Sequence, residues 1–491
     1  MFQTPMIPMR EMAIPHGTNH AAQYIGTFLI ALMLHAFPPV SFAASPAPTK
    51  LKLRGYLTAR IDDSTVAILD DHIQLARGGH VEGRDSSAGT ALSFAGLATG
   101  QLVDAEGTWQ GKHLFSADHI TVEGGLSDKS VHESVYLQGE PAEGPVIAAG
   151  EAAELKADGE WLTIGPKTHR EWPPADASAK SASLRKARTE DATTGAPVAV
   201  YAGRQIHYSG VRREDGRVDT QSIELRDPAP PEAYNNPHDV QVVRGKDVQT
   251  GIELLEFRRG GKVDGRLKLF PVPEVQQYVA DLGTSLLPAG QLGTTRALEF
   301  RFFVVEDSSI NAQSFPDGTV LVNTGLLGVV ENEAELAFAM SHEIAHVLQV
   351  HTWREANETR AAKVGLLIVG IAGTYYIGDL SIYLSKVGMA AVANGHLRGL
   401  ENQADRLGLQ TIIDRGYDPR EATKLMRTLV ERYGDRSTSL LWSNHDSSVL
   451  RGSFLAAQLE AQYPQGHFDG ARVDTKAFQG MREAMGPVKI N

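Results

Sequence analysis

The chain has 491 residues, of which 42% are hydrophobic and 22% are charged, a composition typical of soluble globular proteins with about two to four domains. Its formal net charge of -12 provides no basic field to attract nucleic acid or anionic lipid, so we expect neither as a main partner. The chain contains no cysteine, which excludes disulfide bonds, thiolate metal ligands, a cysteine nucleophile and lipid attachment through an N-terminal cysteine.

The N-terminal segment has the pattern of an export signal. Arg10 precedes the apolar run Tyr24–Phe37, which is followed by "PPV" and by the small residues Ser41 and Ala43. This order resembles a secretory signal peptide over residues 1–43, cleaved after Ala43. The run is short for a stable transmembrane span, so we favour cleavage, and retention as an anchor is the alternative. Together with the lack of cysteine, the segment predicts export, to a bacterial periplasm.

The next part of the chain is rich in Gly, Thr and Val and alternates as strands do, and it contains an internal repeat. The stretch Gly100–Val122 lies without gaps over Gly203–Leu225, and Gly55–Leu69 corresponds to Gly150–Ile164. We interpret the repeat as two small β-barrels in tandem, of the oligonucleotide/oligosaccharide-binding (OB-like) type, although Gly-turn-strand patterns also match by chance. Aromatic residues are sparse here, which argues against a nucleic-acid stacking platform.

The C-terminal half has an α+β pattern. The Pro- and Asn-rich run Asp227–Asp239 is typical of a linker, and beyond it Pro273–Leu287 has apolar residues at helical spacing. "LEFRFFVVED" predicts a strand, "FPDGTVLVNTGLL" a turn and a second strand, and "ENEAELAFAMSHEIAHVLQVH" a long helix.

The long helix carries a His-Glu-x-x-His motif. Residues four apart lie on one helix face, so His342 and His346 can present two imidazoles to one ion, with Glu343 placed near a metal-bound water. Zinc hydrolysis needs this arrangement, but a motif of this length also arises by accident. Glu401 and Asp405 are also four apart on a predicted helix, so that one carboxylate can bind zinc while the other hydrogen-bonds a ligand His. The alternative for this pair is a solvated helix face.

Four ordered segments carry a resemblance to a known family. "NAQSFPDGTVLVNTGLL", "AELAFAMSHEIAHVLQVH", "ENQADRLGLQTIIDRGYDP" and "NHDSSVLR" occur in an order and spacing that resembles the CAAX-prenyl-protease family of gluzincin metallopeptidases. The likeness is closer to its soluble periplasmic members, which act in outer-membrane protein quality control, and it covers Val248–Leu459. It implies a zincin-type domain that binds one Zn²⁺ per chain. The implied ligands are His342, His346 and Glu401, with Glu343 as general base and Asp405 as the hydrogen-bond partner of a ligand His.

The resemblance also implies two further catalytic residues. The family carries a late His followed six residues later by Arg, and His445 and Arg451 fit this spacing. His445 would stabilise the oxyanion and Arg451 would orient it. Family members commonly have Pro after that His, whereas this chain has Asp446, so the loop departs from the family pattern. Without the resemblance, His445 reads as a surface loop histidine.

A strand before the motif helix is the predicted substrate-binding element. We expect an exposed edge strand that pairs with an extended peptide through main-chain hydrogen bonds, which predicts broad specificity for unfolded segments. The residues of this predicted strand are Gly318, Thr319, Val320, Leu321 and Val322. The Gly-rich apolar segment Val364–Gly395 predicts a buried helical hairpin or a lid, and a peripheral dip into the membrane is the alternative.

The sequence thus predicts a multidomain protein with N-terminal all-β tandem small barrels and an α+β zincin-type metallopeptidase domain. The predicted order is a signal peptide at 1–43, β-domains at 50–128 and 137–228, a linker at 229–245 and the peptidase domain at 246–491. The predicted function is that of an exported zinc-dependent endopeptidase acting on unfolded or misassembled envelope proteins. The alternative is a non-catalytic zinc-containing chaperone or scaffold. In either case the β-domains are candidates for contact with an envelope protein partner.

Overall fold

The computed structural model divides into two compact units, Met1–Lys50 and Leu51–Asn491, and the elements described below belong to the second. The predicted signal peptide and the segment Val364–Gly395 lie outside the described residues. The structure describes residues 50–84, 91–136, 153–157, 160–171, 205–226, 233–234, 240–288, 298–354, 396–433, 448–464, 466, 468–488 and 490.

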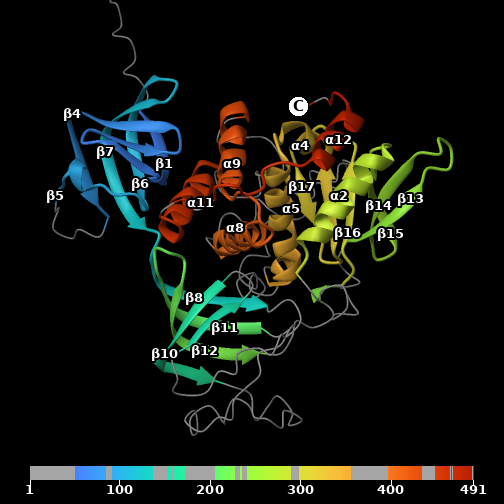
Figure 1. Cartoon of the computed structure of the whole chain (residues 1–491), viewed down its shortest axis with the longest axis horizontal. Helices are drawn as coiled ribbons and strands as arrows, with labels where there is room; N and C mark the ends of the chain where they lie inside the picture. Colours follow the sequence, from blue (N-terminus) through green and yellow to red (C-terminus); the bar gives the residue numbers. More distant parts are fainter. Residues whose placement is uncertain are drawn as a thin grey trace, which may run out of the picture. The chain divides into compact units, whose positions relative to one another are not determined.

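The first β-region forms one seven-stranded sheet in the order β1-β6-β7-β4-β3-β2, with β5 paired to β4 (Figure 1). Alternate residues of β6 and β7 are buried, and they build a core around Val103, Phe115 and Ile120. The strands are β1 (Leu51–Tyr56), β2 (Ala59–Asp62), β3 (Thr65–Ile68), β4 (Asp71–Gly83), β5 (Ala91–Leu92), β6 (Gln101–Gly111) and β7 (Leu114–Gly125).

The second β-region forms a five-stranded sheet in the order β8-β11-β12-β10-β9. Its first strand begins at Asp128, so the boundary predicted at residue 137 is wrong. The predicted start leaves out β8, whose Val131 and Val135 are buried in the core of this sheet. The strands are β8 (Asp128–Tyr136), β9 (Ala153–Ala157), β10 (Glu160–Glu171), β11 (Gln205–Arg212) and β12 (Val218–Arg226).

The two sheets share features that support the predicted duplication. The aligned segments form the antiparallel hairpins β6-β7 and β11-β12, and their second strands pair in parallel with β4 and β10. Each hairpin shifts register at the matched glycines Gly107 and Gly210. A Cβ there would lie 2.0 Å from the Ser116 carbonyl oxygen and 2.3 Å from that of Asp219, so both bulges require glycine. Among the described strands the pairings run as open paths, and the OB-like barrel stays a prediction.

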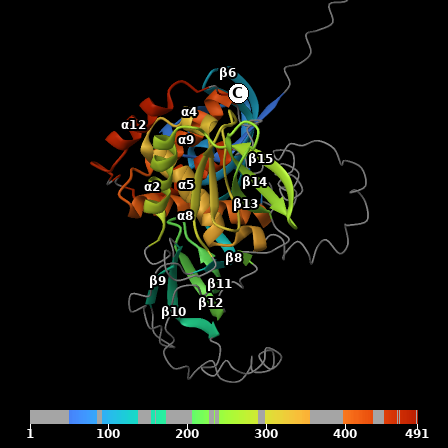
Figure 2. The ribbon, with the colours of Figure 1, turned by 90° about the vertical axis from the view of Figure 1, so that its right-hand side faces the viewer.

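A three-stranded antiparallel sheet leads into the peptidase region. It consists of β13 (Gln241–Lys246), β14 (Glu253–Arg259) and β15 (Lys262–Lys268) (Figure 2). Part of the predicted linker 229–245 is therefore strand β13. The strand forms because Val242 is buried against Phe257 and Leu321, which ties this sheet to the peptidase core.

The peptidase region packs helices against a small sheet of β16 (Arg301–Val305), β17 (Ala312–Ser314) and β18 (Thr319–Asn323). Helix α5 contacts β17 and β18, and α5 and α8 lie side by side in both views (Figures 1 and 2). None of the described helices combines the length and apolarity that crossing a bilayer requires. The helices are α2 (Pro273–Leu286), α4 (Thr324–Val329), α5 (Glu333–Leu348), α8 (His396–Asp414), α9 (Arg420–Tyr433), α11 (Ser448–Gln462) and α12 (Lys476–Met485).

The strand predicted to bind substrate at Gly318–Val322 lies in the centre of this sheet. Strand β18 pairs in parallel with β16 and antiparallel with β17, and its five residues are buried. Both backbone edges of β18 are therefore occupied, and the prediction that it is an exposed edge strand is wrong. Strand β17, the hairpin partner of β18, takes the position at the edge of the sheet, whereas the parallel pairing of β18 with β16 is non-local and could not be inferred from the pattern of one strand.

Candidate metal centre

Helix α5 supplies the His-Glu-x-x-His residues and has a well-capped start. The Asn332 side chain accepts a hydrogen bond from the Glu335 N–H at 3.0 Å, and Glu333 and Glu335 place negative charge in the first turn. His342 and Glu343, three turns further on, are buried, which is unusual for such polar residues unless they have partners.

Three ligand-type atoms converge between α5 and α8. The His342 Nε2 and His346 Nε2 atoms are 3.0 Å apart, and each is 3.5 Å from a carboxylate oxygen of Glu401. Zinc bonds of 2.0 to 2.1 Å in tetrahedral geometry place neighbouring ligand atoms about 3.3 Å apart, so this donor set fits a metal ion of that size. The two imidazole planes are inclined by 75°, so their lone pairs can converge on one point.

Close packing of α8 on α5 positions Glu401. Ala345 of α5 meets Ala404 and Leu407 of α8 in a small buried cluster. A Cβ on Gly408 would lie 3.1 Å from the His342 backbone nitrogen, so glycine allows the two helix backbones to approach closely. The small side chains thus set the separation between the two imidazoles and the carboxylate.

The second nitrogen of His342 is held by a buried ion pair. His342 Nδ1 is 3.0 Å from Asp405 Oδ1, and Arg451 of α11 donates to both Asp405 oxygens at 2.8 and 2.6 Å. Burial opposes ionisation of Asp405, but Arg451 and His342 hold the pKa of this carboxyl well below its usual range. Burial and Arg451 also oppose protonation of His342, yet Asp405 and Glu401 raise its pKa to about 9 without metal.

The second nitrogen of His346 has partners that the sequence analysis missed. His346 Nδ1 lies 2.9 Å from His351 Nδ1, and His351 Nε2 lies 3.0 Å from Gln403 Oε1. Burial, His346 and Arg354 lower the pKa of His351 well below its usual value, so this imidazole is neutral. A third His five residues after the motif was a visible signal, but helical spacing gives no reason to bring His351 back to His346.

The carboxylate of Glu343 points to the edge of the small sheet. Ser314 of β17 donates its hydroxyl hydrogen to Glu343 Oε2 at 2.7 Å. The hydrogen bond joins the predicted base to the strand whose outer edge is unpaired among the described strands. His445, the predicted oxyanion residue, lies outside the described residues. Arg451, predicted to orient it, is buried against Asp405 and lies 3.4 Å from His342 Nδ1.

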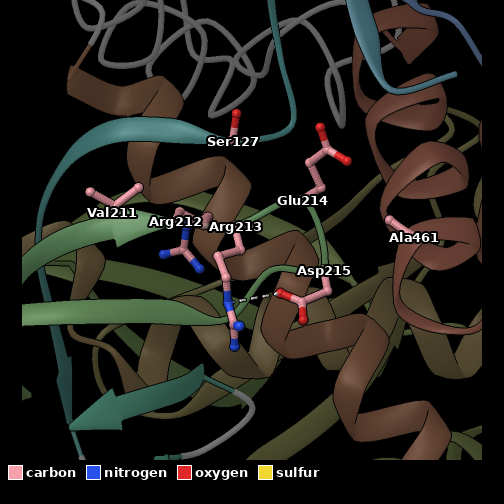
Figure 3. Close-up of a pocket in the computed structure, with 7 residues that line it drawn as sticks. All are labelled: Ser127, Val211, Arg212, Arg213, Glu214, Asp215 and Ala461. Atoms are coloured by element: carbon pink, nitrogen blue, oxygen red, sulfur yellow. Dashed lines mark ion pairs between the residues drawn. The ribbon is translucent and has the colours of Figure 1, made fainter. Parts of the chain in front are cut away.

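The described residues include a second cluster of possible metal ligands and a surface pocket, and neither has the arrangement of the centre at His342. His80, Glu82 and His119 gather on β4 and β7, but the two imidazoles are stacked at 18°, so their lone pairs run nearly parallel. A pocket beside α11 is lined by Ser127, Val211–Asp215 and Ala461, and Arg213 points to Asp215 within it (Figure 3). This pocket contains none of the predicted site residues.

Comparisons with known proteins assign part of the chain to a peptidase family. Residues 273–460 match the model of peptidase family M48, and His342, His346 and Glu401 lie within this range. Residues 273–460 therefore form a domain of the peptidase M48 class, and the relatives named below are metalloproteases. This confirms the class that the four sequence segments predicted.

The chain is similar to named metalloproteases over part of its length. It is 29% identical over 206 residues, 40% of each chain, to the "Beta-barrel assembly-enhancing protease" of Escherichia coli strain K12. A "Putative beta-barrel assembly-enhancing protease" of Vibrio cholerae is 32% identical over 33% of this chain and 34% of its own. The "Mitochondrial metalloendopeptidase OMA1" of Schizosaccharomyces pombe is 29% identical over 31% of this chain and 45% of its own. Each match covers less than half of the relative.

Proposed function

We propose that this chain is an exported zinc endopeptidase that hydrolyses peptide bonds in unfolded or misassembled proteins of a bacterial cell envelope. The observation that carries the proposal is the meeting of three ligand atoms, from His342, His346 and Glu401, with the carboxylate of Glu343 beside a strand edge. The names of the bacterial relatives refer to β-barrel assembly, which supports a substrate among β-barrel proteins. The apolar run and small residues of the N-terminus support export.

The chemistry follows from the placement of the chain's own groups. A zinc ion held by this donor set would supply an acidified water and a polarising charge for the peptide carbonyl. Glu343 accepts the proton of the attacking water and passes it to the leaving amine. The Ser314 hydroxyl orients the Glu343 carboxylate, and the ion pair of Asp405 with Arg451 holds the His342 ring. We retain His445 as the proposed donor to the oxyanion.

Strand β17 is the proposed substrate-binding edge in place of β18. The Asn311 carbonyl accepts the Asn323 N–H, and the Phe315 N–H donates to the Thr319 carbonyl, so both residues face β18. Because backbone groups alternate along a strand, the N–H and C=O groups of Ala312 and Ser314 face the other way. An extended peptide can pair with this edge through its main chain, which favours unfolded segments over particular side chains.

Glu343→Gln tests the catalytic role while preserving side-chain shape. We expect the purified variant to hold one zinc per chain, as the wild type does, and to lose cleavage of a casein substrate by at least about a hundredfold. His342→Ala should lose the zinc as well. If the wild type with one zinc per chain cuts no unfolded protein, the peptidase proposal fails and the scaffold alternative stands. If His342→Ala keeps one zinc per chain, the ligand assignment is wrong.

A further inference from the structure

A continuous set of hydrogen bonds joins the metal centre to the second β-sheet. His346 Nδ1 is 2.9 Å from His351 Nδ1, and His351 Nε2 is 3.0 Å from Gln403 Oε1. Gln403 Nε2 donates to the Ser134 backbone carbonyl of β8 at 2.9 Å, and Arg354 Nη1 donates to Gln403 Oε1 at 2.8 Å. His351, Gln403 and Ser134 are all buried, so water does not offer alternative partners to the chain of bonds.

The positions of the protons in these hydrogen bonds follow from the requirements of a metal ligand. A metal at Nε2 of His346 needs the lone pair there, so the proton of that ring is on Nδ1. This Nδ1–H donates to Nδ1 of His351, whose own proton is then on Nε2 and faces Gln403 Oε1. Each bond thus fixes the direction of the next.

The Gln403 side-chain amide can make all of these hydrogen bonds in only one of its two orientations. In the reverse orientation its NH₂ group would face the N–H groups of His351 and Arg354, and its oxygen would face the Ser134 carbonyl oxygen. Both contacts would be repulsive, because donors would meet donors and acceptors would meet acceptors. The Ser134 carbonyl and the Arg354 guanidinium together therefore set the amide, and the amide sets His351.

The backbone before His351 is bent to allow this contact. Val350 has a φ of 47°, a left-handed conformation that is strained for a β-branched residue. Helix α5 ends at Leu348, and the turn through Gln349 and Val350 brings the His351 ring to within 4.8 Å of the His346 ring, centroid to centroid. Continued helix would place His351 well away from the ligand face, since five residues advance about 140° beyond a full turn.

The second sheet is held against α8 by buried charges, which keeps Ser134 in register. Arg406 donates to Glu160 at 3.0 and 2.7 Å and to Glu133 at 2.9 Å, and Arg212 pairs with the same two carboxylates. Burial opposes ionisation of Glu160, yet the two arginines lower its pKa to about 2. The strand that carries Ser134 is thus fixed to the helix that carries Gln403.

We propose that the second β-sheet belongs to the metal centre, because it orients Gln403 and through His351 fixes the tautomer of the ligand His346. Gln403 and His351 are positioning residues that act on His346 through its Nδ1 atom, the ring nitrogen that does not face the metal. The inference rests on the proposed function, since it takes His346 as a metal ligand, and it gives the second β-region a role in metal affinity.

The hydrogen bonds from His346 through His351 and Gln403 to Ser134 form a relay. Zinc affinity of the full-length protein, measured by competition with a chromogenic chelator, tests this relay without using activity. Removing a hydrogen-bond partner behind a ligand His typically costs 10- to 100-fold in metal affinity, and we expect this loss for Gln403→Leu and for His351→Phe. Gln403→Glu keeps an acceptor for His351 and Arg354 but loses the donor to the Ser134 carbonyl, so we expect a loss of zinc affinity smaller than that of Gln403→Leu. The visible spectrum of the Co²⁺-loaded chain should change most in Gln403→Leu and His351→Phe and less in Gln403→Glu.

A control variant separates this set of hydrogen bonds from loss of packing. Gln410→Leu changes a buried glutamine of the same helix whose amide bonds to Asp414, and it should keep wild-type zinc affinity. A Gln410→Leu loss equal to that of Gln403→Leu, or a Gln403→Glu loss equal to that of Gln403→Leu, would overturn the proposal.

The failure of this inference is distinguishable from failure of the proposed function. If His342→Ala abolishes zinc binding while Gln403→Leu and His351→Phe bind zinc as the wild type does, the metal centre stands and the relay is wrong. If His342→Ala binds zinc normally, the metal centre itself is wrong. Circular dichroism spectra that match the wild type show that each variant is folded. Should Gln403→Leu fail to fold, the comparison of His351→Phe with Gln403→Glu decides the proposal.

Discussion

Glu335 in the first turn of α5 is expected to make the stability of the peptidase region depend on pH. Its side chain is fully buried, Oε2 accepts the Glu331 N–H at 2.7 Å, and Oε1 has no hydrogen-bond partner among the described residues. Burial raises the pKa of Glu335 from 4.5 to about 7, although the Glu331 N–H and Lys424 oppose the increase. The folded chain therefore binds a proton here that the unfolded chain releases at lower pH.

The sign and size of the effect follow from this difference. Between pH 4.5 and about 7 the folded state binds more protons than the unfolded state, so the free energy of unfolding falls as the pH rises. The contribution of Glu335 is complete below pH 4.5 and is lost above pH 7. Because each pH unit between the two pKa values is worth about 1.4 kcal/mol, the loss amounts to roughly 3 kcal/mol.

Glu335→Gln should remove this dependence, since an amide stays neutral and its oxygen can still accept the Glu331 N–H. We expect urea unfolding, followed by far-ultraviolet circular dichroism, to show the variant more stable than the wild type by up to about 3 kcal/mol at pH 8. The advantage should shrink steadily towards pH 5. Glu331→Gln removes a nearby exposed carboxylate and serves as control, with a small difference that varies little with pH. A Glu335→Gln difference that is constant from pH 5 to 8 would refute the reasoning.

The metal centre yields three further predictions. Asp405 and Glu401 outweigh burial and raise the pKa of His342 to about 9, so zinc must displace a proton from this imidazole. The zinc affinity, measured by chelator competition, should therefore rise about tenfold per pH unit from pH 6.5 to 8.5. A pH-independent affinity would contradict this. Arg451→Met should destabilise the chain by about 3 to 5 kcal/mol in urea unfolding, because it leaves the Asp405 carboxylate buried without its cation. Gly408→Ala should weaken zinc binding several-fold despite its higher helix propensity, since the added methyl presses on the His342 backbone, and unchanged affinity would show that α8 can shift freely.

The parts of the site that the sequence predicted are those encoded by local periodicity. His342, His346, Glu401 and Asp405 are pairs at a spacing of four, and the two helices that carry them bring the pairs together as the spacing suggests. A four-residue spacing fixes a common helix face whatever the tertiary structure. The resemblance of ordered segments then supplied what spacing alone could not, namely that two separate helices meet.

The parts that the sequence did not predict depend on non-local pairing or on backbone conformation. Strand β18 was predicted as an edge, but it lies between its hairpin partner β17 and strand β16, and the parallel pairing with β16 is the non-local one. The contact of His351 with His346 depends on the left-handed conformation of Val350, and a β-branched residue is among those least expected there. Local propensity argues for continued helix at this position, and tertiary contacts prevail over it.

The buried charges between the second sheet and α8 are better explained by geometry than by stability. Two carboxylates, Glu133 and Glu160, face two guanidinium groups, Arg212 and Arg406, so the cluster is neutral as a whole. Apolar residues of similar volume would often give equal or greater stability, because desolvation offsets most of the attraction between buried charges. Apolar packing does not fix the register of a strand, because methyl groups tolerate sliding. Planar guanidinium groups donate hydrogen bonds to carboxylates in only a few directions, and this fixes the register. A slip of one residue in β8 would turn the carbonyl of Ser134 away from Gln403, so a directional cluster at this interface protects the bond on which the orientation of the ligand depends.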